Sequence, residues 1–202
     1  MSARGLAVRL LQLYVGLVCF GLSLALMLQA HLGLGPWDVL HQGIAERLGV
    51  PIGWVVNGVG AAVMLAWIPL RERPGLGTVS NVVVIGLVVD AALGRLPAPE
   101  PLAARIAFLA AGVVGTAIGT GLYVGAGLGP GPRDGLMTGL ARRGWPIRAV
   151  RTGIEVAVLA LGFALGGSVG VGTVAFAFGI GPLVHITLPL FARPARPQGG
   201  TA

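Results

Sequence analysis

The sequence GLGPWDVL at residues 33–40 decides the fold, because a related sequence, GLGPGPRDGL, follows at residues 127–136. The likeness continues further along the chain, where GLGTV at residues 75–79 is matched by GVGTV at 170–174. The offset is about 95 positions throughout, and the order of the matches is preserved. Glycine is common here, with 35 copies, so a single match carries no weight, but an ordered series predicts an internal duplication.

The composition indicates a protein of the membrane. Hydrophobic residues make up 55% of the 202 positions, charged residues only 10%, and the mean hydropathy is +0.87. A soluble domain has about 25% charged residues, and a disordered chain has low hydrophobicity, so both classes are excluded. The net charge of +7 would suggest nucleic acid in a soluble protein, but in a membrane protein the location of the charges must decide.

Six segments are long and apolar enough to cross a bilayer, which takes about 20 residues. They are residues 6–30, 53–70, 78–96, 102–126, 151–169 and 173–191, the first of them interpreted as an uncleaved span. We therefore expect an all-α fold with a single membrane domain over residues 1–191, in which repeat 1 covers about 6–96 and repeat 2 about 102–191. Residues 192–202 are expected to form a disordered cytoplasmic tail.

Each repeat also has a short polar helix after its first span, at about residues 36–48 and 132–143. Thirteen residues rise only about 20 Å, so these helices are expected to be re-entrant or interfacial. Trp37, Leu40 and Ile44 recur at helical spacing on one face of the first helix, with Asp38 and His41 away from it.

Three spans per repeat place the second repeat upside down relative to the first, an arrangement that recurs in secondary transporters. Arginine placement indicates the orientation, because cytoplasmic loops carry the excess of positive residues. With both termini in the cytoplasm, eleven of the 14 arginines are cytoplasmic and only Arg47, Arg95 and Arg105 lie outside. The sequence thus predicts a multi-pass inner-membrane protein with cytoplasmic N- and C-termini.

The Gly-Pro helix starts supply the first group of candidate residues for a substrate or ion pathway. These are Gly35, Pro36, Asp38 and His41 in repeat 1, and Gly129, Pro132 and Asp134 in repeat 2. Helix N-termini that face a polar cavity can bind an anionic or polar substrate through their N–H groups. The alternative is that Asp38 and Asp134 only compensate the positive ends of their own helices, which is worth about 0.3–1 kcal/mol.

Ionisable residues inside predicted spans form the second group, because each costs at least about 2.5 kcal/mol in the membrane. Asp90 and its repeat counterpart His185 are candidates for a proton path, and Glu155 is a third coupling candidate. The alternatives are that Asp90 extends to the outer surface, that His185 packs in a hydrogen-bonded role, and that Glu155 pairs with Arg151 one turn earlier.

The sequence carries no motif for several other functions. A phosphate-binding loop needs lysine, which the chain lacks, and its three histidines and single cysteine have no metal-ligand spacing. We therefore expect no metal, no cofactor, no nucleic-acid partner and no enzymatic activity.

The motifs GLGPWDVL (33–40) and GLGTVSN (75–81) resemble the YczE/YyaS/YitT family of bacterial integral membrane proteins. The resemblance covers nearly the whole chain, from about residue 10 to 191, although repeat 2 has GPGPRD where repeat 1 has GPWD. It implies an inner-membrane protein, and for some relatives the export of small molecules. It transfers no catalytic residue.

These features favour a secondary transporter or exporter of an unknown small molecule in the lipid bilayer. The alternative is a non-transporting scaffold or regulator that binds a partner membrane protein. Three small-residue faces, at residues 115–119, 121–125 and 162–166, could pack within the bundle or join a homo-oligomer.

Overall fold

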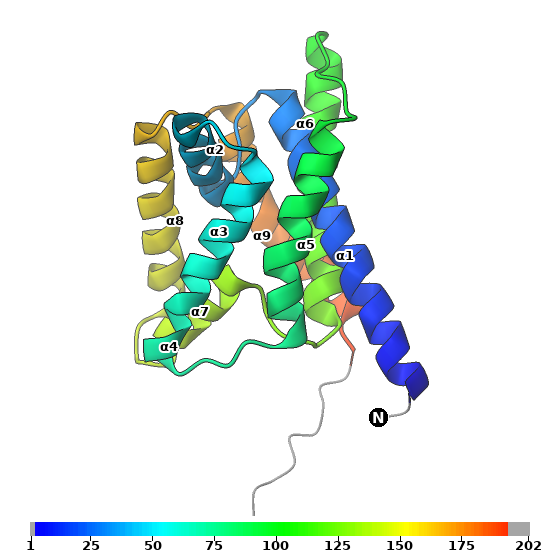
Figure 1. The fold of residues 1–202 in the computed structure, drawn as a ribbon, viewed down its shortest axis with the longest axis vertical. Coiled ribbons are helices and arrows are strands. Elements are labelled where there is room, and N and C mark those ends of the chain that lie inside the picture. Colours follow the sequence, from blue (N-terminus) through cyan, green and yellow to red (C-terminus); the bar gives the residue numbers. More distant parts are fainter. Residues whose placement is uncertain (1–2, 194–202) are drawn as a thin grey trace, which may run out of the picture.

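The computed structural model describes residues 3–193, and the rest of the tail predicted at 192–202 lies outside the described residues. The described chain is all-helical and contains no strand. Its helices are α1 (Ala3–Ala30), α2 (Pro36–Leu48), α3 (Ile52–Leu65), α4 (Trp67–Leu70), α5 (Leu76–Leu93), α6 (Leu102–Gly125), α7 (Pro132–Ala141), α8 (Ile147–Ala164) and α9 (Val171–Phe191). The long helices form one bundle, and the short helices α2 and α7 lie near its opposite ends (Figure 1).

Five helical stretches between residues 3 and 193 are long and apolar enough to cross a membrane. They are Arg4–Ala30, Ile52–Leu70 (α3 with α4), Leu76–Leu93, Leu102–Gly125 and Val171–Phe191. Helix α8 has 18 residues but is not among them, because it carries Arg148, Arg151 and Glu155. The span predicted at residues 151–169, which corresponds to α8, therefore stays a prediction.

Two predicted spans differ from the helices that form, and proline or glycine accounts for each difference. Pro69 has no N–H to donate to the carbonyl of Leu65 and its ring crowds that carbonyl, so the second span breaks into α3 and α4. The fifth span, expected at 151–169, runs instead from Ile147 to Ala164. It ends there because Gly166 has a φ of +106°, which leaves the helical region.

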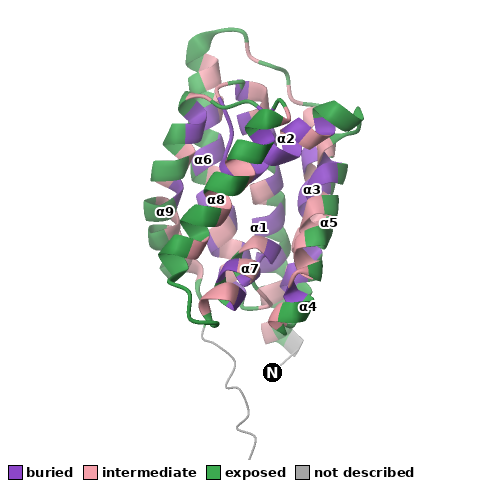
Figure 2. Ribbon diagram, turned by 90° about the vertical axis from the view of Figure 1, so that its left-hand side faces the viewer, coloured by how far each residue is buried: buried purple, intermediate pink, exposed green. Residues whose placement is uncertain are grey.

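Helices α1 and α6 form the centre of the bundle and approach closely through small residues. A Cβ added at Gly16 would lie 2.6 Å from the Tyr123 nitrogen, and one at Gly119 would lie 2.8 Å from the Gly16 oxygen. The buried Gln12 side chain donates hydrogen bonds to the carbonyls of Leu122 (3.0 Å) and Phe191 (2.9 Å), which joins α1, α6 and α9. Buried residues gather on the inward faces of the helices, and the outward faces are exposed (Figure 2).

The two halves of the chain hold each other through crossed contacts. The loop that follows α1 binds the start of α9, where the Gly172 nitrogen donates to the carbonyl of Leu32 (2.6 Å). The loop that follows α6 binds the start of α5 in the same way, since the Gly77 nitrogen donates to the carbonyl of Leu128 (2.8 Å). Likewise α2 packs mainly on α8, and α7 contacts α3, α4 and α8. Each short helix is thus positioned by the opposite half.

The outer helices are packed unequally. Helix α5 lies along α1, and α9 lies along α6, so both halves share this arrangement. Helix α3 packs along α5 in the first half, but α8 makes at most marginal contact with α9 in the second. The side of the bundle between α8 and α9 is therefore the less tightly closed one.

Candidate functional site

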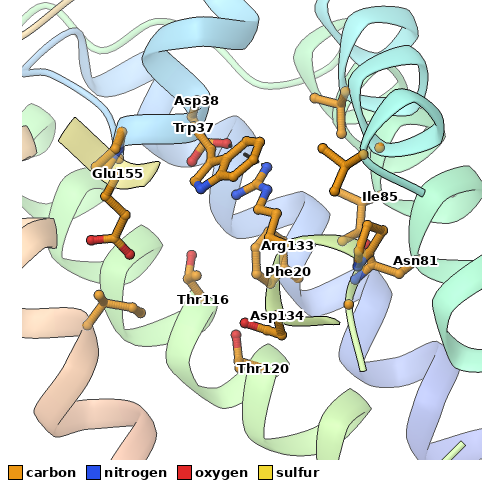
Figure 3. A pocket seen from close by; sticks show the side chains of 18 of the residues that line it. Phe20, Trp37, Asp38, Asn81, Ile85, Thr116, Thr120, Arg133, Asp134 and Glu155 are labelled. Atoms are coloured by element: carbon orange, nitrogen blue, oxygen red, sulfur yellow. Dashed lines mark hydrogen bonds and ion pairs between the residues drawn. The ribbon is translucent and has the colours of Figure 1, made fainter. Parts of the chain in front are cut away.

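A partly open cavity of about 200 Å³ lies between the N-terminal turns of α2 and α7. Helices of both halves supply its walls. Its polar lining residues are Asp38, His41, Asn81, Thr116, Thr120, Tyr123, Arg133, Asp134, Arg151 and Glu155, and its apolar ones include Phe20, Trp37, Val56, Ile85, Phe176, Ile180 and Val184. Figure 3 shows carboxylates, hydroxyls and a guanidinium gathered around one space.

The Gly-Pro pairs direct two helix N-termini into this cavity. Gly35 and Gly131 are the N-cap residues, with φ near −60° and ψ near 156°, and the following prolines begin α2 and α7. Neither glycine has room for a side chain, because an added Cβ would lie 2.8 Å from the Phe176 ring or 2.7 Å from the Tyr123 hydroxyl. The partial positive charge of each helix start thus faces the cavity.

Asp38 lies at the centre of a polar cluster that joins the halves. Its Oδ1 is 3.5 Å from Nη2 of Arg133 and 3.3 Å from Nδ1 of His41. The Arg133 guanidinium also lies over the Trp37 ring, 5.0 Å from its centroid, in cation–π geometry. Asp38 and His41 are almost fully buried, so the charge of Arg133 and their contact with each other compensate their polarity in place of water, although Nδ1 of His41 makes no hydrogen bond.

This cluster sets the protonation states on α2. Burial alone would raise the pKa of Asp38, but the His41 imidazole and the Arg133 charge together outweigh it and lower the pKa. Burial, with help from Arg133, also lowers the pKa of His41 against the opposing influence of Asp38. The cluster therefore contains an ionised Asp38, a charged Arg133 and a neutral His41 at neutral pH.

Asp134, the repeat counterpart of Asp38, has different surroundings. Its carboxyl group is exposed to the cavity, and Oδ2 accepts a hydrogen bond of 3.1 Å from the Tyr123 hydroxyl. The restricted solvent of the enclosing protein raises the pKa of Asp134, although Tyr123 and the charges of Arg133 and Arg151 oppose this shift. The two matched aspartates therefore differ in their tendency to bind a proton.

Glu155 and Arg151 form an ion pair of 2.9 Å along α8, and both side chains line the cavity. The pairing expected for Glu155 is therefore confirmed, and it occurs beside the cavity rather than away from it. Thr116 and Thr120 on α6 contribute hydroxyls to the cavity wall (Figure 3).

The other predicted residues lie outside the cavity lining. Asp90 accepts a hydrogen bond of 2.7 Å from the Gly53 nitrogen at the start of α3, so it caps a neighbouring helix. Gly129 forms a turn with a φ of +128°, packed against Gly75. His185 is exposed on α9. The proposed Asp90–His185 proton path thus receives no geometric support, because neither residue lines the cavity.

Sequence reasoning missed several contributors to the cavity, including Tyr123, the hydrogen-bond partner of Asp134. Trp37 was assigned to an apolar face turned away from Asp38, but its ring lines the same cavity and is 93% buried. Arg133 was interpreted only as an orientation signal, and Arg151 as an orientation signal and as the ion-pair partner of Glu155. The available signal was the repeat itself, because Arg133 occupies the position of Trp37, and residues related by an inverted repeat can meet near its axis.

Both ends of the cavity are covered in this structure. At the end where α1 begins and α9 ends, here called the terminal end, the Trp67 indole donates to the Pro132 carbonyl (3.0 Å). Arg142 and Glu72 form an ion pair of 2.8 Å beside it. At the opposite end, α2 packs on Gly162, and the Gln42 side chain accepts a bond of 2.8 Å from the Ser168 nitrogen.

No group of three His, Cys, Asp or Glu side chains within residues 3–193 is arranged to hold a metal ion. Asp38 and His41 are the acidic and imidazole groups in closest contact here, and Arg133 already neutralises Asp38.

Comparison with known proteins supports a single family over almost the whole chain. The model of a family of unknown function, DUF6198, matches residues 7–189. This chain belongs to the DUF6198 family. Relatives include an uncharacterized protein of Haemophilus influenzae, 43% identical over 90% of this chain and 84% of the relative. The uncharacterized membrane protein YczE of Bacillus subtilis is 34% identical over 87% of this chain and 83% of its own length.

A third relative, the uncharacterized protein YyaS of Bacillus subtilis, is 25% identical over 89% of this chain and 92% of its own length. The expected kinship with YczE and YyaS is thereby confirmed. No solved structure matches this DUF6198 protein significantly. Its membrane character rests on the five apolar helices and on the YczE relative.

Proposed function

We propose that this DUF6198 protein is a secondary transporter that moves a small molecule through the cavity between its two halves. The observation that carries the proposal is the cavity itself, which combines apolar walls with several ionisable side chains, is large enough for a ligand and is lined by both halves. Binding sites between repeats are typical of secondary transporters. A dry interface filled with Leu and Val would have favoured a scaffold instead. The proposal includes no chemical conversion.

The cavity lining supports an inverted-repeat architecture, which we include in the proposal. Many lining residues occur in pairs separated by 95 or 96 positions: Phe20 and Thr116, Asp38 and Asp134, Val56 and Arg151, Gly60 and Glu155, Ile85 and Ile180. The crossed hydrogen bonds at Gly77 and Gly172 are matched in the same way. A site on a pseudo-twofold axis has this property, since each lining position occurs twice.

Helix α8 is the sixth span in this proposal. Its three charged residues make it less hydrophobic than the other long helices, but Arg151 and Glu155 face the cavity rather than lipid. A charged residue inside a span is tolerated on the inner side of the bundle. With six spans, the arginine distribution favours cytoplasmic termini and an inner-membrane location.

Exchange between the two sides would occur by opening one covered end at a time. The terminal end is covered by contacts of α4 and α7, and the opposite end by contacts of α2 and α8. These are equivalent contacts in the two halves. Breaking one set while the other stays formed would expose the cavity to one side only, which is the requirement for alternating access.

Thiol accessibility tests this proposal without knowledge of the substrate. The native Cys19 is replaced by Ser, and Thr120→Cys places a thiol in the cavity wall. Membrane vesicles of both orientations are treated with membrane-impermeant sulfonatoethyl methanethiosulfonate, and N-ethylmaleimide gives the total thiol. We expect slow labelling of Cys at position 120 from both sides.

A charge substitution at the terminal end makes the test specific for alternating access. Glu72→Arg removes the ion pair with Arg142, so labelling should increase from the terminal side and decrease from the opposite side. The double substitution Glu72→Arg with Arg142→Glu should restore the original balance. A protein that shows no labelling from either side, or no reciprocal change, does not work by this mechanism.

The rival function is a non-transporting partner-binding protein. The small-residue faces that would support such contacts are filled within the chain. Gly119 packs on Phe20, Gly121 on Thr187, and Gly162 on Leu40. A homo-oligomer through these faces stays a prediction, and it would require these internal contacts to open.

A further inference from the structure

The charges that line the cavity do not cancel completely. Asp38 is paired with Arg133, and Glu155 is paired with Arg151. Asp134 lines the same cavity but forms no ion pair of 4.0 Å or less within residues 3–193, and its hydrogen-bond partner Tyr123 is neutral. A carboxylate that has no ion-pair partner and lies beside apolar walls is a favourable position for binding a proton or a cation.

The groups that face Asp134 come from several helices. Tyr123 lies on α6, Arg133 on α7, and Arg151 with Glu155 on α8. The α2 groups Asp38 and His41 line the same cavity, and Asn81 is the polar contributor of α5. The α9 residues at the cavity, Phe176, Ile180, Gly181 and Val184, are uncharged. The arginines are already engaged by other carboxylates, which leaves Asp134 as the open anionic position.

The uncharged residues that line the cavity indicate what kind of molecule would fit beside Asp134. Aromatic and aliphatic side chains, including Phe20, Ile85 and Phe176, form apolar walls. The Trp37 indole nitrogen is buried and has no hydrogen-bond partner, and its ring borders the open space in Figure 3. It can donate to an acceptor on a ligand. A dry cavity of about 150 Å³ holds benzene, so a cavity of about 200 Å³ suits one aromatic ring with a small polar head.

The cavity is less closed beside α8 than at its two ends, and in a membrane the outer side of α8 would face lipid. Helices α8 and α9 both contribute lining residues, but they are not packed together. A Cβ added at Gly181 would meet nothing within 4 Å, so this part of α9 borders open space. Because contacts cover both ends of the cavity, the gaps on the two sides of α8, toward α3 and toward α9, are the available routes in this conformation. A molecule that uses either of them is dissolved in the membrane.

We infer that the transported molecule is a lipophilic organic cation, such as an amine with an aromatic body, which binds at Asp134 in exchange for a proton. This inference rests on the proposed transport function. On binding, the Asp134 carboxyl group loses its proton to the solvent, and the carboxylate then balances the charge of the cation. On release the carboxylate takes up one proton, so one proton and one monovalent cation exchange per cycle. The raised pKa of Asp134 fits this role, because it favours proton binding by the carboxyl group when no cation is present.

Binding measurements in detergent test the charge preference with three probes of nearly equal shape. Benzyltrimethylammonium carries a permanent positive charge, neopentylbenzene is its neutral isostere, and phenylmethanesulfonate is an anion of similar size. We expect calorimetry to detect binding of the cation alone, with release of protons in weakly buffered solution. Below the pKa of Asp134 the apparent Kd should rise about tenfold per pH unit, because proton and cation compete.

Variants assign the effect to one carboxyl group. Asp134→Asn should weaken cation binding at least about tenfold and remove its pH dependence. Glu100→Gln, which removes an acidic group from the loop between α5 and α6, is the matched control and should bind as the natural protein does. Tyr123→Phe keeps the carboxyl group but removes its hydrogen bond, so the pKa of Asp134 should rise and the binding curve should move to higher pH.

The outcomes separate this inference from transport itself. Equal binding of the neutral or anionic probe, or unchanged cation binding by folded Asp134→Asn protein, overturns the inference. If the inference fails in this way but the labelling of the cysteine at position 120 still changes reciprocally between the two sides, the transport proposal remains intact. Cation binding without alternating accessibility would overturn the transport function, and with it the exchange cycle.

Discussion

The helix pair α3–α5 in the first half and the pair α8–α9 in the second occupy matching positions but pack differently. In the first pair, a Cβ added at Gly53 would lie 2.1 Å from the Gly86 oxygen, so the helices touch through backbone. The matching residues of the second pair are Arg148 and Gly181, and Gly181 has no contact partner within 4 Å. Replacement of one small residue by arginine removes the close packing and leaves this side of the cavity open.

The same comparison extends to the groups that line the cavity. Val56 and Gly60 of α3 correspond to Arg151 and Glu155 of α8, so only the second helix supplies charge. The first half thus retains a tightly packed wall, and the second half provides the opening and most of the ionisable groups. A duplicated sequence can separate these tasks, because one copy maintains the bundle while the other departs from it.

The largest effect is expected at the ion pair that joins the halves. Arg133→Met leaves the buried Asp38 carboxylate without its cation, which should lower the free energy of unfolding by about 3 kcal/mol at neutral pH. Arg151→Met is the matched control within the second half. Its ion pair is partly exposed, so the loss should stay below about 1 kcal/mol. Thermal unfolding in detergent measures both.

The pH dependence of the first variant has a defined sign. In the natural protein the pKa of Asp38 is lowered, so its stabilising contribution is present above the unfolded pKa and is lost as the pH falls through the folded one. Without Arg133, burial dominates and raises the pKa of Asp38. The stability difference between the two proteins should therefore shrink as the pH falls from 7 to 4. A constant difference would contradict the assigned ion pair.

The next effect compares matched glycines of α5 and α9. Gly86→Ala places a Cβ 2.0 Å from the Asn57 side-chain oxygen and 2.2 Å from the Gly53 oxygen, so α3 must move away from α5. We expect a loss of about 1–3 kcal/mol. Gly181→Ala meets open space and should change stability by less than about 0.5 kcal/mol. Equal losses in the two unfolding curves would mean that α9 is packed like α5.

The smallest effect separates Asp90 from His185. Asp90→Ala removes the acceptor for the Gly53 nitrogen, and the lost helix cap should cost about 1–2 kcal/mol. His185→Ala removes an exposed side chain and should have no measurable effect on unfolding. Asp90→Asn keeps an acceptor oxygen and should recover part of the loss. If His185→Ala were as costly as Asp90→Ala, the two halves would be more alike than the packing indicates.

Local sequence signals were sufficient to predict where the short helices begin, but not which side chains of the other half they contact. Pro36 and Pro132 predicted the starts of both short helices, because proline fits the first helical position. The glycines expected beside them were Gly35 and Gly129, but the cap of α7 is Gly131. Asp38 and Asp134 were named with them. Their pairing with Arg133 and Tyr123 depends on how the two halves cross, and spacing along one helix contains no such information.

Asp90 illustrates the same limit from the other direction. An acid within an apolar run was a reasonable candidate for a proton path, but its partner is a backbone nitrogen of a different helix. The ion pair of Arg151 and Glu155, four residues apart on one helix, was predictable because helix geometry alone brings them together. Contacts within one helix could therefore be predicted from the sequence, whereas contacts between the two halves could be identified only from the structure.

The crossed placement of the short helices has a consequence for biosynthesis. Helix α2 is complete at residue 48, but its principal neighbour α8 begins only at Ile147. A ribosome must therefore add about a hundred further residues before Asp38 and Arg133 can meet. Contacts between residues so distant in sequence form late and slowly in folding. Until then the nascent chain carries Asp38 without the cation that neutralises it, so the early intermediates of membrane insertion lack this ion pair.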